Sequence, residues 1–299
     1  MKVAFVILHY MTTEDTVDCV NSILQNISYK DYEIIIVNNG SANDSSMLLH
    51  QAYDNNIKVH IIDSKVNLGF AKGNNLGFIY AKKIMDIDFV IMINNDTIIN
   101  QDNFIEIVIK KYKAHKFDIL GPDIISLIDN SHQNPYGIVN YSLNERKLKK
   151  VIFKYNIFIL FNYLNLDQMM KKTFKIMRKK RNETVSNNEN YKYEQSNVRL
   201  HGSCLIFSPD YVKKYNGLYD KTFLYMEEDI LYYISKKEGL KMIYSPSVKI
   251  LHKEDSSTNT LFDNKVMKRR FIYKNIRKSA IEFLKIIKDD QIYKMNILD

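Results

Sequence analysis

The sequence predicts an α/β fold whose central sheet is largely parallel, and three observations support this prediction. Short apolar runs rich in β-branched residues alternate with helical patterns through the first half of the chain. The 299 residues, 45% hydrophobic and 12% aromatic, are enough for a sizeable core. Asn-rich loops follow apolar runs at points where strands should end. Because open α/β sheets bind ligands beyond the carboxyl ends of their strands, these loops should converge on one polar crevice.

The elements of the first half follow one another as alternating strand and helix units. Each expected strand is an apolar run, and each expected helix has apolar residues at helical spacing. The expected strands are Val3–Leu8, Tyr32–Val37, Val59–Asp63, Phe89–Ile93 and Phe117–Gly121, and the expected helices are Glu14–Gln25, Ser45–Tyr53, Lys72–Met85 and Asp102–Lys113.

The second half is less regular. The stretch Arg181–Gln195 is polar and poor in aliphatic residues, so we expect a mobile loop there. An apolar run, a helix, two short strands and a basic amphipathic helix should follow it. These later elements are expected at Leu205–Phe207, Glu227–Lys237, Lys241–Tyr244, Val248–Leu251 and Lys265–Ile287.

Composition and hydropathy exclude several classes of protein. The two cysteines, Cys19 and Cys204, are far apart and match no metal-ligand spacing, so neither a disulfide scaffold nor a zinc cluster is expected. The apolar run at the N-terminus is short and is followed by acidic residues, which favours a buried strand over a signal peptide. No run approaches the roughly 20 apolar residues of a transmembrane helix. A reducing, cytoplasmic setting is therefore expected.

Positive charge is concentrated in one segment. Residues 141–182 contain twelve Lys or Arg against Glu145 and Asp167, so the rest of the chain is close to neutral although the whole carries +9. Aromatic and aliphatic residues lie between the basic ends, a composition that suits an interfacial helix on an anionic membrane. A partly solvated helical insertion explains the segment equally well. Nucleic acid is not expected as a partner, because the charge is confined to this segment and no known nucleic-acid module accompanies it.

Three loops carry residues that indicate chemistry. The first, Val37–Ser41, follows a strand and by itself is an Asn-Gly turn. The second, Asn67–Asn75, opens a helix whose N–H groups, together with Lys72, can meet an anion. The third, Ile93–Thr97, places Asp96 beyond an apolar strand, where its carboxylate could hold Mg²⁺ or Mn²⁺. Each loop alone has an ordinary structural explanation, but their order and placement together favour a binding site.

The ordered motifs resemble those of family 2 glycosyltransferases, inverting enzymes with the GT-A fold, and especially their rhamnosyltransferase-like branch. Val37–Ser41 is similar to the family's V-D-N-x-S, and Asn67–Asn75 is similar to N-x-G-x-x-x-G-N-N. Asn94–Asp96 is similar to the metal-binding D-x-D. Gly121–Ile124 and Gln133–Pro135 are similar to the family's G-P-x-I and Q-N-P.

The resemblance resumes at Gly202 and runs to His252, so it covers most of the chain except the basic segment and the last helix. It implies an enzyme that moves a sugar from a nucleotide-diphosphate sugar, with UDP or dTDP preferred over GDP, to a glycan or lipid-linked glycan with inversion. Such an enzyme would depend on Mn²⁺ or Mg²⁺ and act in bacterial surface polysaccharide synthesis. It would be cytoplasmic and peripheral at the inner face of the plasma membrane, with an anionic membrane surface as a further partner.

The resemblance also implies a division of the chain. Residues 1–125 would form the donor-binding half of a GT-A fold. Residues 126–260 would form the acceptor-binding half, with a basic helical insertion at 141–198, and 261–299 would form a C-terminal basic amphipathic helix.

The matched motifs assign roles to individual residues. An acceptor hydroxyl must lose its proton as it attacks. The family takes its base from an E-D pair that follows F-x-Y, and the matching stretch here is Gly217–Asp229, which ends in the acidic block Glu227–Asp229. In this block we assign Glu228 first, Asp229 second and Glu227 as an orienting group. Asp96 and His252 are assigned to the metal, although a lone His is as often structural. The acceptor set is His201, Gly202 and Ser203, and the donor set is His9, Tyr10, Asn38, Asn39, Ser41, Asn67, Gly69, Phe70, Lys72, Gly73, Asn74, Asn94 and Asn95.

Three positions depart from the family pattern. Asn38 replaces a nucleobase-contacting Asp, Asn94 replaces the first carboxylate of D-x-D, and Ile230 replaces the usual second Asp of the acidic block. Two alternatives therefore stay open. One is a nucleotidyltransferase of similar fold, which would need a nucleoside triphosphate and commonly a Gly-rich basic loop where His9–Thr13 lies here. The other is a non-catalytic relative that binds glycans or membranes.

Overall fold

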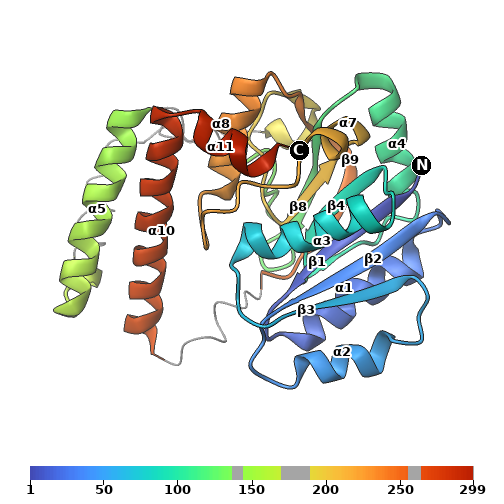
Figure 1. The fold of residues 1–299 in the computed structure, drawn as a ribbon, viewed down its shortest axis with the longest axis horizontal. Helices are drawn as coiled ribbons and strands as arrows, with labels where there is room; N and C mark the ends of the chain where they lie inside the picture. Colours follow the sequence, from blue (N-terminus) through green and yellow to red (C-terminus); the bar gives the residue numbers. More distant parts are fainter. Residues whose placement is uncertain (137–143, 170–188, 255–263, 299) are drawn as a thin grey trace.

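Figure 1 shows the computed structural model, which describes residues 1–136, 144–169, 189–254 and 264–298. Within these residues one mixed sheet of nine strands is covered by helices on both faces, so the predicted α/β class is confirmed. The strand order across the sheet is β3-β2-β1-β4-β8-β6-β9-β5, and β7 pairs with β9.

The N-terminal elements build a parallel half-sheet. β1 (Val3–His9) lies between β2 (Tyr32–Asn39) and β4 (Phe89–Asn94), and β3 (Val59–Ser64) pairs with β2, all in parallel. Parallel neighbours need crossover connections, which helices supply here. The predicted strands and helices of this part are confirmed, with no end displaced by more than two residues. The first three helices are α1 (Thr13–Asn26), α2 (Ser45–Tyr53) and α3 (Phe70–Ile84).

The other half of the sheet is mixed. β8 (Cys204–Phe207), which comes late in the chain, lies between β4 and β6 (Ile119–Ser126) and is antiparallel to both. Cys204 pairs with Ile93, so the start of β8 lies beside the end of β4. The apolar run of β8 predicts burial, but its direction and its neighbours come only from the structure.

Two predictions about this half differ from the structure. The strand expected at Phe117–Gly121 is β6, which begins at Ile119 and continues to Ser126. Lys241–Tyr244 and Val248–Leu251 are parts of a single strand, β9 (Met242–His252), which runs parallel to β6. The pairing register shifts midway along β6, and β9 bulges at that point. The bulge contains Pro246, which has no N–H to donate to a ladder, so the chain stays extended without an ordinary pair there.

Short elements complete the fold. The predicted loop Arg181–Gln195 is described only from residue 189, where it forms a 3₁₀ turn and then β7, and residues 181–188 lie outside the described part. The short elements are β5 (Thr97–Ile98), α4 (Phe104–His115), η1 (Glu189–Lys192), β7 (Gln195–Ser196), α7 (Pro209–Lys214), α8 (Glu227–Glu238) and α11 (Gln291–Ile297).

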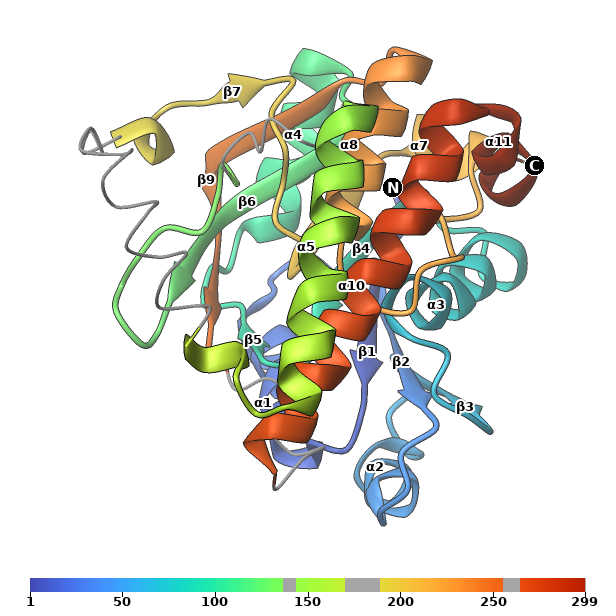
Figure 2. The same cartoon turned by 90° about the vertical axis from the view of Figure 1, so that its left-hand side faces the viewer.

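Two long helices stand side by side against one face of the molecule (Figure 2). α5 (Glu145–Tyr163) comes from the basic segment and α10 (Lys265–Lys288) from the C-terminal region. They are antiparallel, since Asn162 near the end of α5 bonds Arg270 near the start of α10. Residues 141–143 and 170–182 of the basic segment lie outside the described part. No helix in the described ranges is long and apolar enough to cross a membrane.

The core lies in two layers, one on each face of the sheet. Along β1, Phe5 and Ile7 pack with α1, α2 and α4, whereas Ala4 and Val6 pack with α3, α7 and α8. This follows from the alternation of side chains along a strand. Phe283 of α10 joins the second layer, which fixes the helix pair to the body of the protein.

Asn75 joins two parts of the chain that are distant in sequence. Its buried side chain in α3 donates to the carbonyl of Leu218 at 2.7 Å and accepts from the N–H of Leu218 at 2.8 Å. Gly217 has φ +113°, and a Cβ added there would lie 2.2 Å from Oδ1 of Asn75, so this close approach requires glycine. The clamp fixes the loop that leads to the acidic block against α3.

We expect Asn75→Ala to lower the free energy of unfolding by about 2–5 kcal/mol, because it leaves a buried N–H and a buried C=O of Leu218 without partners. Urea unfolding followed by circular dichroism measures the loss. The matched control is Asn55→Ala at an exposed position, which should change stability by no more than about 0.5 kcal/mol. Equal losses in the two variants would contradict the clamp.

Candidate active site

The three Asn-rich loops lie side by side at one edge of the sheet. β1, β2 and β4 are parallel neighbours, with His9 paired to Asn38 and Leu8 paired to Asn94. The segment before β8 reaches the same edge, since the N–H of Asn94 donates to the carbonyl of Ser203 at 2.9 Å. Sheet pairing therefore brings residues from four distant parts of the sequence to one place.

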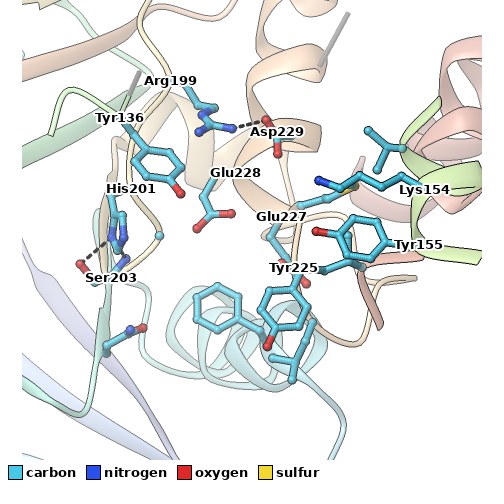
Figure 3. Close-up of a pocket in the computed structure, with 17 residues that line it drawn as sticks. Tyr136, Lys154, Tyr155, Arg199, His201, Ser203, Tyr225, Glu227, Glu228 and Asp229 are labelled. Atoms are coloured by element: carbon cyan, nitrogen blue, oxygen red, sulfur yellow. Dashed lines mark hydrogen bonds and ion pairs between the residues drawn. The ribbon is translucent and has the colours of Figure 1, made fainter. Parts of the chain in front are cut away.

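A pocket of about 550 Å³ opens beside this edge (Figure 3). Its walls come from Phe70 of the second loop, Asn94 of the third loop, the segment before β8, the start of α8 and the helix pair α5 and α10. The pocket brings together the predicted acceptor set, the three predicted carboxylates, and Phe70 and Asn94 of the donor set. The side chains labelled in Figure 3 are Tyr136, Lys154, Tyr155, Arg199, His201, Ser203, Tyr225, Glu227, Glu228 and Asp229.

The carboxylate of Glu228 points into the pocket, between His201 and Glu227 (Figure 3). Glu228 is half-buried, whereas Glu227 and Asp229 are only 7% and 5% exposed. Gly202 packs against it, because a Cβ added there would lie 2.7 Å from Oε1 of Glu228 and would displace this carboxylate. Glu228 is thus the most accessible of the three carboxylates.

Asp229 is held by an ion pair. Its carboxylate binds the guanidinium of Arg199, and both side chains are buried. The guanidinium also stacks on Tyr136, with 4.0 Å from Cζ to the ring centroid. Burial raises the pKa of Asp229 to about 6, although the charge of Arg199 acts in the opposite direction. The carboxylate of Asp229 therefore holds the guanidinium of Arg199 in place against the ring of Tyr136.

Glu227 is a neutral acid near neutral pH. Burial, and then the charge of Glu228, raises the pKa of Glu227 to about 8. Its Oε1 accepts a hydrogen bond from the hydroxyl of Thr222 at 3.0 Å. The two preceding residues, Tyr225 and Met226, have φ values of +73° and +70°, a strained conformation for residues with side chains. This turn fixes the direction in which the acidic block leaves the loop and enters α8.

His201 lines the pocket as a neutral ring. The N–H of Ser203 donates to its Nδ1 at 3.2 Å, so the ring hydrogen is assigned to Nε2. Burial, and then the charge of His252, lowers the pKa of His201 to about 4. Asn134 accepts the backbone N–H of His201 at 2.8 Å and holds it in place. His201 therefore offers a hydrogen-bond donor without a charge.

Asp96 and His252 form the candidate metal position. Nε2 of His252 lies 3.2 Å from Oδ1 of Asp96, and this buried oxygen accepts no hydrogen bond. Gln133 donates to Glu254 at 2.8 Å, so its carbonyl oxygen faces Nδ1 of His252 at 2.8 Å and the ring hydrogen is assigned to Nδ1. In neutral His252 a lone pair on Nε2 then faces a carboxylate oxygen, and a cation or a proton between them would stabilise that arrangement.

A carboxylate and an imidazole nitrogen are suitable ligands for Mn²⁺, and the oxygen of Asp96 that accepts no hydrogen bond would be free to coordinate such a cation. In the part of the chain that the structure describes, no group of three or more His, Cys, Asp or Glu side chains could hold a metal. A metal held by Asp96 and His252 would therefore take its other ligands from diphosphate oxygens and water.

Several Asn side chains of the donor set bond to the protein itself. Asn39 donates to Oδ1 of Asn67 at 3.1 Å and accepts from the N–H of Leu68 at 2.9 Å. Asn74 donates to the carbonyl of Phe70 at 3.0 Å. These amides shape the second loop, and their direct contact with a donor stays a prediction.

The glycines of the second loop permit close contacts inside the protein. Gly69 has φ +83°, and a Cβ there would lie 2.3 Å from the carbonyl oxygen of Phe223. The same oxygen accepts the N–H of Phe70 at 2.8 Å. At Gly73 a Cβ would lie 2.6 Å from Leu8. The second loop is therefore packed directly against the loop that precedes the acidic block.

The remaining donor residues are divided between the interior and the surface. His9 is fully buried, with Nδ1 2.7 Å from the hydroxyl of Thr16 and no partner for Nε2. Asn95 donates to the same hydroxyl at 3.0 Å. Burial lowers the pKa of His9 to about 4, so it is neutral at physiological pH. Tyr10 and Ser41 are half-buried, and Lys72 is exposed.

Asn38 has a fixed orientation. Its Nδ2 donates to Oδ1 of Asp63 at 2.7 Å, and Asp63 also binds Ser46 and His50. Oδ1 of Asn38 makes only a long contact of 3.4 Å with the N–H of Ser41. A carboxylate, that of Asp63 on the neighbouring strand, therefore lies beside Asn38.

The structure adds pocket residues that the motifs do not identify. Arg199 and Tyr136 stand outside every motif, and no periodicity or spacing marks them. Lys154 and Tyr155 lie in the basic segment, whose composition indicates a membrane or solvent contact rather than a pocket wall. Gln133–Asn134 belongs to the Q-N-P stretch, so the resemblance marks these residues but not their bonds to the two histidines.

Comparison with known proteins supports the family resemblance. The model of the Glycosyl transferase family 2 matches residues 5–190. Poly-beta-1,6-N-acetyl-D-glucosamine synthase of Staphylococcus aureus (strain COL) is 30% identical over 100 residues, which are 33% of this chain and 23% of that protein. The protein of the same name from Staphylococcus epidermidis is 28% identical over 100 residues, with the same coverage. These matches span about a quarter of the length of the curated relatives.

Solved structures support the GT-A-type fold. The structure of S. aureus TarS 1–349 aligns with a TM-score of 0.50 and 12% identity, over 99% of this chain and 74% of that one. Its complex with UDP-GlcNAc aligns with the same TM-score and 11% identity. The rhamnosyltransferase-like branch stays a prediction. Because the family model covers more than half of the sequence, the chain belongs to glycosyl transferase family 2.

Proposed function

We propose that the protein transfers a sugar from a UDP- or dTDP-sugar to a hydroxyl of a glycan or lipid-linked glycan, with inversion of the anomeric carbon. The observation that carries this proposal is the accessible carboxylate of Glu228, which points into a pocket of about 550 Å³ beside the loop that ends β4. Similarity to structures of S. aureus TarS in complex with UDP and with UDP-GlcNAc supports a nucleotide-sugar donor.

The acceptor would lie in the pocket. Glu228 takes the proton of the acceptor hydroxyl as its oxygen attacks the anomeric carbon. The new bond forms on one face of the sugar while the bond to the diphosphate oxygen breaks on the other, so the configuration inverts. Asp229 would act through Arg199 rather than as the base, because its carboxylate is already bound by the guanidinium.

The donor would lie across the edge formed by the three loops. Asp96 and His252 would hold Mn²⁺ or Mg²⁺, which when bound neutralises charge on the departing diphosphate. Since Asp63 holds Nδ2 of Asn38, Oδ1 is left to accept from a base with a ring N–H, as uracil and thymine have. In this proposal residues 1–125 bind the donor and 126–260 bind the acceptor.

The proposed setting is the inner face of a bacterial plasma membrane, in surface polysaccharide synthesis. The similarity to poly-beta-1,6-N-acetyl-D-glucosamine synthases supports a polysaccharide product. Transfer of a labelled sugar from a nucleotide donor tests the activity. Binding of the donor with neither transfer nor hydrolysis would instead favour the non-catalytic relative.

Thermal shift with UDP-, dTDP- and GDP-sugars in the presence of Mn²⁺ identifies the donor. We expect a UDP- or dTDP-sugar to raise the melting temperature, because a ligand that binds only the native state stabilises it. Asp96→Ala should lose the part of the shift that requires Mn²⁺, and the exposed control Asp31→Ala should keep it. A Mn²⁺-dependent shift that survives in Asp96→Ala would overturn the metal assignment.

Glu228→Gln should lower kcat by about 10²–10⁴-fold, because it removes the general base. The donor-induced thermal shift should persist, since the amide keeps the size of the side chain. The exposed control Glu106→Gln should keep wild-type kcat. Wild-type turnover in Glu228→Gln would exclude it as the base.

Glu227 gives a pH dependence of defined sign. Its pKa is raised from 4.5 to about 8, so above pH 4.5 the unfolded chain releases a proton that the folded protein keeps. The stability associated with this group is therefore complete below pH 4.5 and is lost as pH rises toward about 8. The unfolding free energy of Glu227→Gln, relative to wild type, should thus increase from pH 5 to pH 8 in urea titrations. A difference that stays constant between these pH values would contradict burial of a neutral Glu227.

A further inference from the structure

At one end of the helix pair, two polar side chains are buried and several apolar side chains are exposed. α5 and α10 are not consecutive in the chain but lie antiparallel like the arms of a hairpin, and we call residues 160–169 and 264–270, where α5 ends and α10 begins, the hairpin tip. Asn162 and Asp167 of this tip are 0% exposed, whereas the polar residues Asn165, Gln168 and Asn264 are exposed. The apolar residues Leu160 and Met169 are 60% and 68% exposed. For the two buried polar and the exposed apolar side chains, water favours the opposite arrangement.

Buried polar contacts hold the hairpin tip in shape. Asp167 accepts two bonds from Arg269, at 2.6 and 3.1 Å, and one from the hydroxyl of Tyr273 at 3.0 Å. Asn162 accepts from Arg270 at 2.8 Å. A charge buried in this way is stable only because it is paired and hydrogen-bonded. The frame therefore presents the apolar side chains outward in a fixed arrangement.

Exposed apolar side chains are concentrated at the hairpin tip. Of the nineteen large hydrophobic residues that are exposed in the described ranges, six belong to the hairpin tip. Single exposed apolar residues are ordinary on a soluble protein, but a local concentration of them indicates an interaction surface. The six residues are Leu160, Tyr163, Leu164, Leu166, Met169 and Met267.

The charge at this end of the helix pair indicates its partner. Residues 160–169 and 264–274 contain five Lys or Arg against one acidic residue, Asp167, which is paired with Arg269. Lys265 and Lys274 are exposed on the first turns of α10. Apolar side chains flanked by Lys and Arg suit the headgroup region of a bilayer with anionic lipids, where both kinds of side chain find favourable surroundings.

We propose that the hairpin tip inserts into the surface of an anionic lipid bilayer. This inference rests on the proposed function and narrows its acceptor to a glycan carried on a membrane lipid. The same two helices line the pocket, through Val151, Lys154 and Tyr155 of α5 and Ile276 of α10. One rigid unit thus joins the lipid surface to the place where the acceptor hydroxyl would lie.

Co-sedimentation with vesicles tests the proposal. The wild-type protein should pellet with phosphatidylglycerol–phosphatidylcholine vesicles more than with phosphatidylcholine alone, and added salt should weaken binding. Replacing Leu160, Leu164 and Met267 together by Ser should weaken partition by about tenfold or more. The matched control replaces Met47, Ile57 and Ile84 by Ser. These residues lie outside the hairpin tip and are 54%, 91% and 68% exposed, and the control should pellet like wild type.

Further measurements separate the possible outcomes. Equal melting temperatures for the tip and control variants would show that the tip variant is folded. Transfer or donor hydrolysis in solution should be unchanged in the tip variant, because its three positions lie outside the pocket lining. Wild-type pelleting by the tip variant would overturn the proposal. So would sedimentation equilibrium showing a dimer that the tip substitutions dissociate without an effect on vesicle binding. If the wild-type protein binds vesicles but turns over no sugar nucleotide, membrane insertion of the hairpin tip would be supported and the proposed function would be contradicted.

Discussion

Antiparallel pairing of β8 with β4 is the constraint on which the site depends. β4 ends in the third Asn-rich loop, and the segment before β8 contains His201–Ser203. Because the two strands run in opposite directions, the end of one lies beside the start of the other, and the Asn94–Ser203 hydrogen bond closes the contact. Without this pairing, nothing in the sheet would bring the third Asn-rich loop and the segment before β8 to the same pocket.

Packing then makes three adjacent carboxylates chemically unequal. Glu227 turns into the protein toward Thr222, Asp229 turns toward Arg199, and Glu228 is left pointing into the pocket. Direct neighbours on a helix point in different directions, so one block can supply a neutral acid, an ion pair and an accessible carboxylate. Sequence alone offers three candidates for the base, and the environment of each side chain ranks them.

The sequence predicts local structure and family well because both depend on short-range patterns. Apolar runs and helical spacing give the strands and helices up to β4 with small end errors. The bulge at Pro246 hides the continuity of β9, since a proline normally marks the end of a paired strand. Three features could not be predicted, because they depend on contacts between segments that are distant in the sequence. They are the direction of β8, the position of Arg199 in the pocket and the burial of Asp167. The Asn substitutions show the same limit, because the carboxylate near Asn38 comes from Asp63 on the next strand.

In the proposed arrangement, the donor lies along the ends of β1, β2 and β4 and faces the acceptor pocket across the β4–β8 junction. A crystal structure with Mn²⁺ and a non-hydrolysable UDP-sugar tests this arrangement most directly. We expect density for the diphosphate beside Asp96 and His252, with the anomeric carbon directed toward the carboxylate of Glu228. Density for the nucleotide away from the ends of β1, β2 and β4, or a sugar directed away from Glu228, would contradict it.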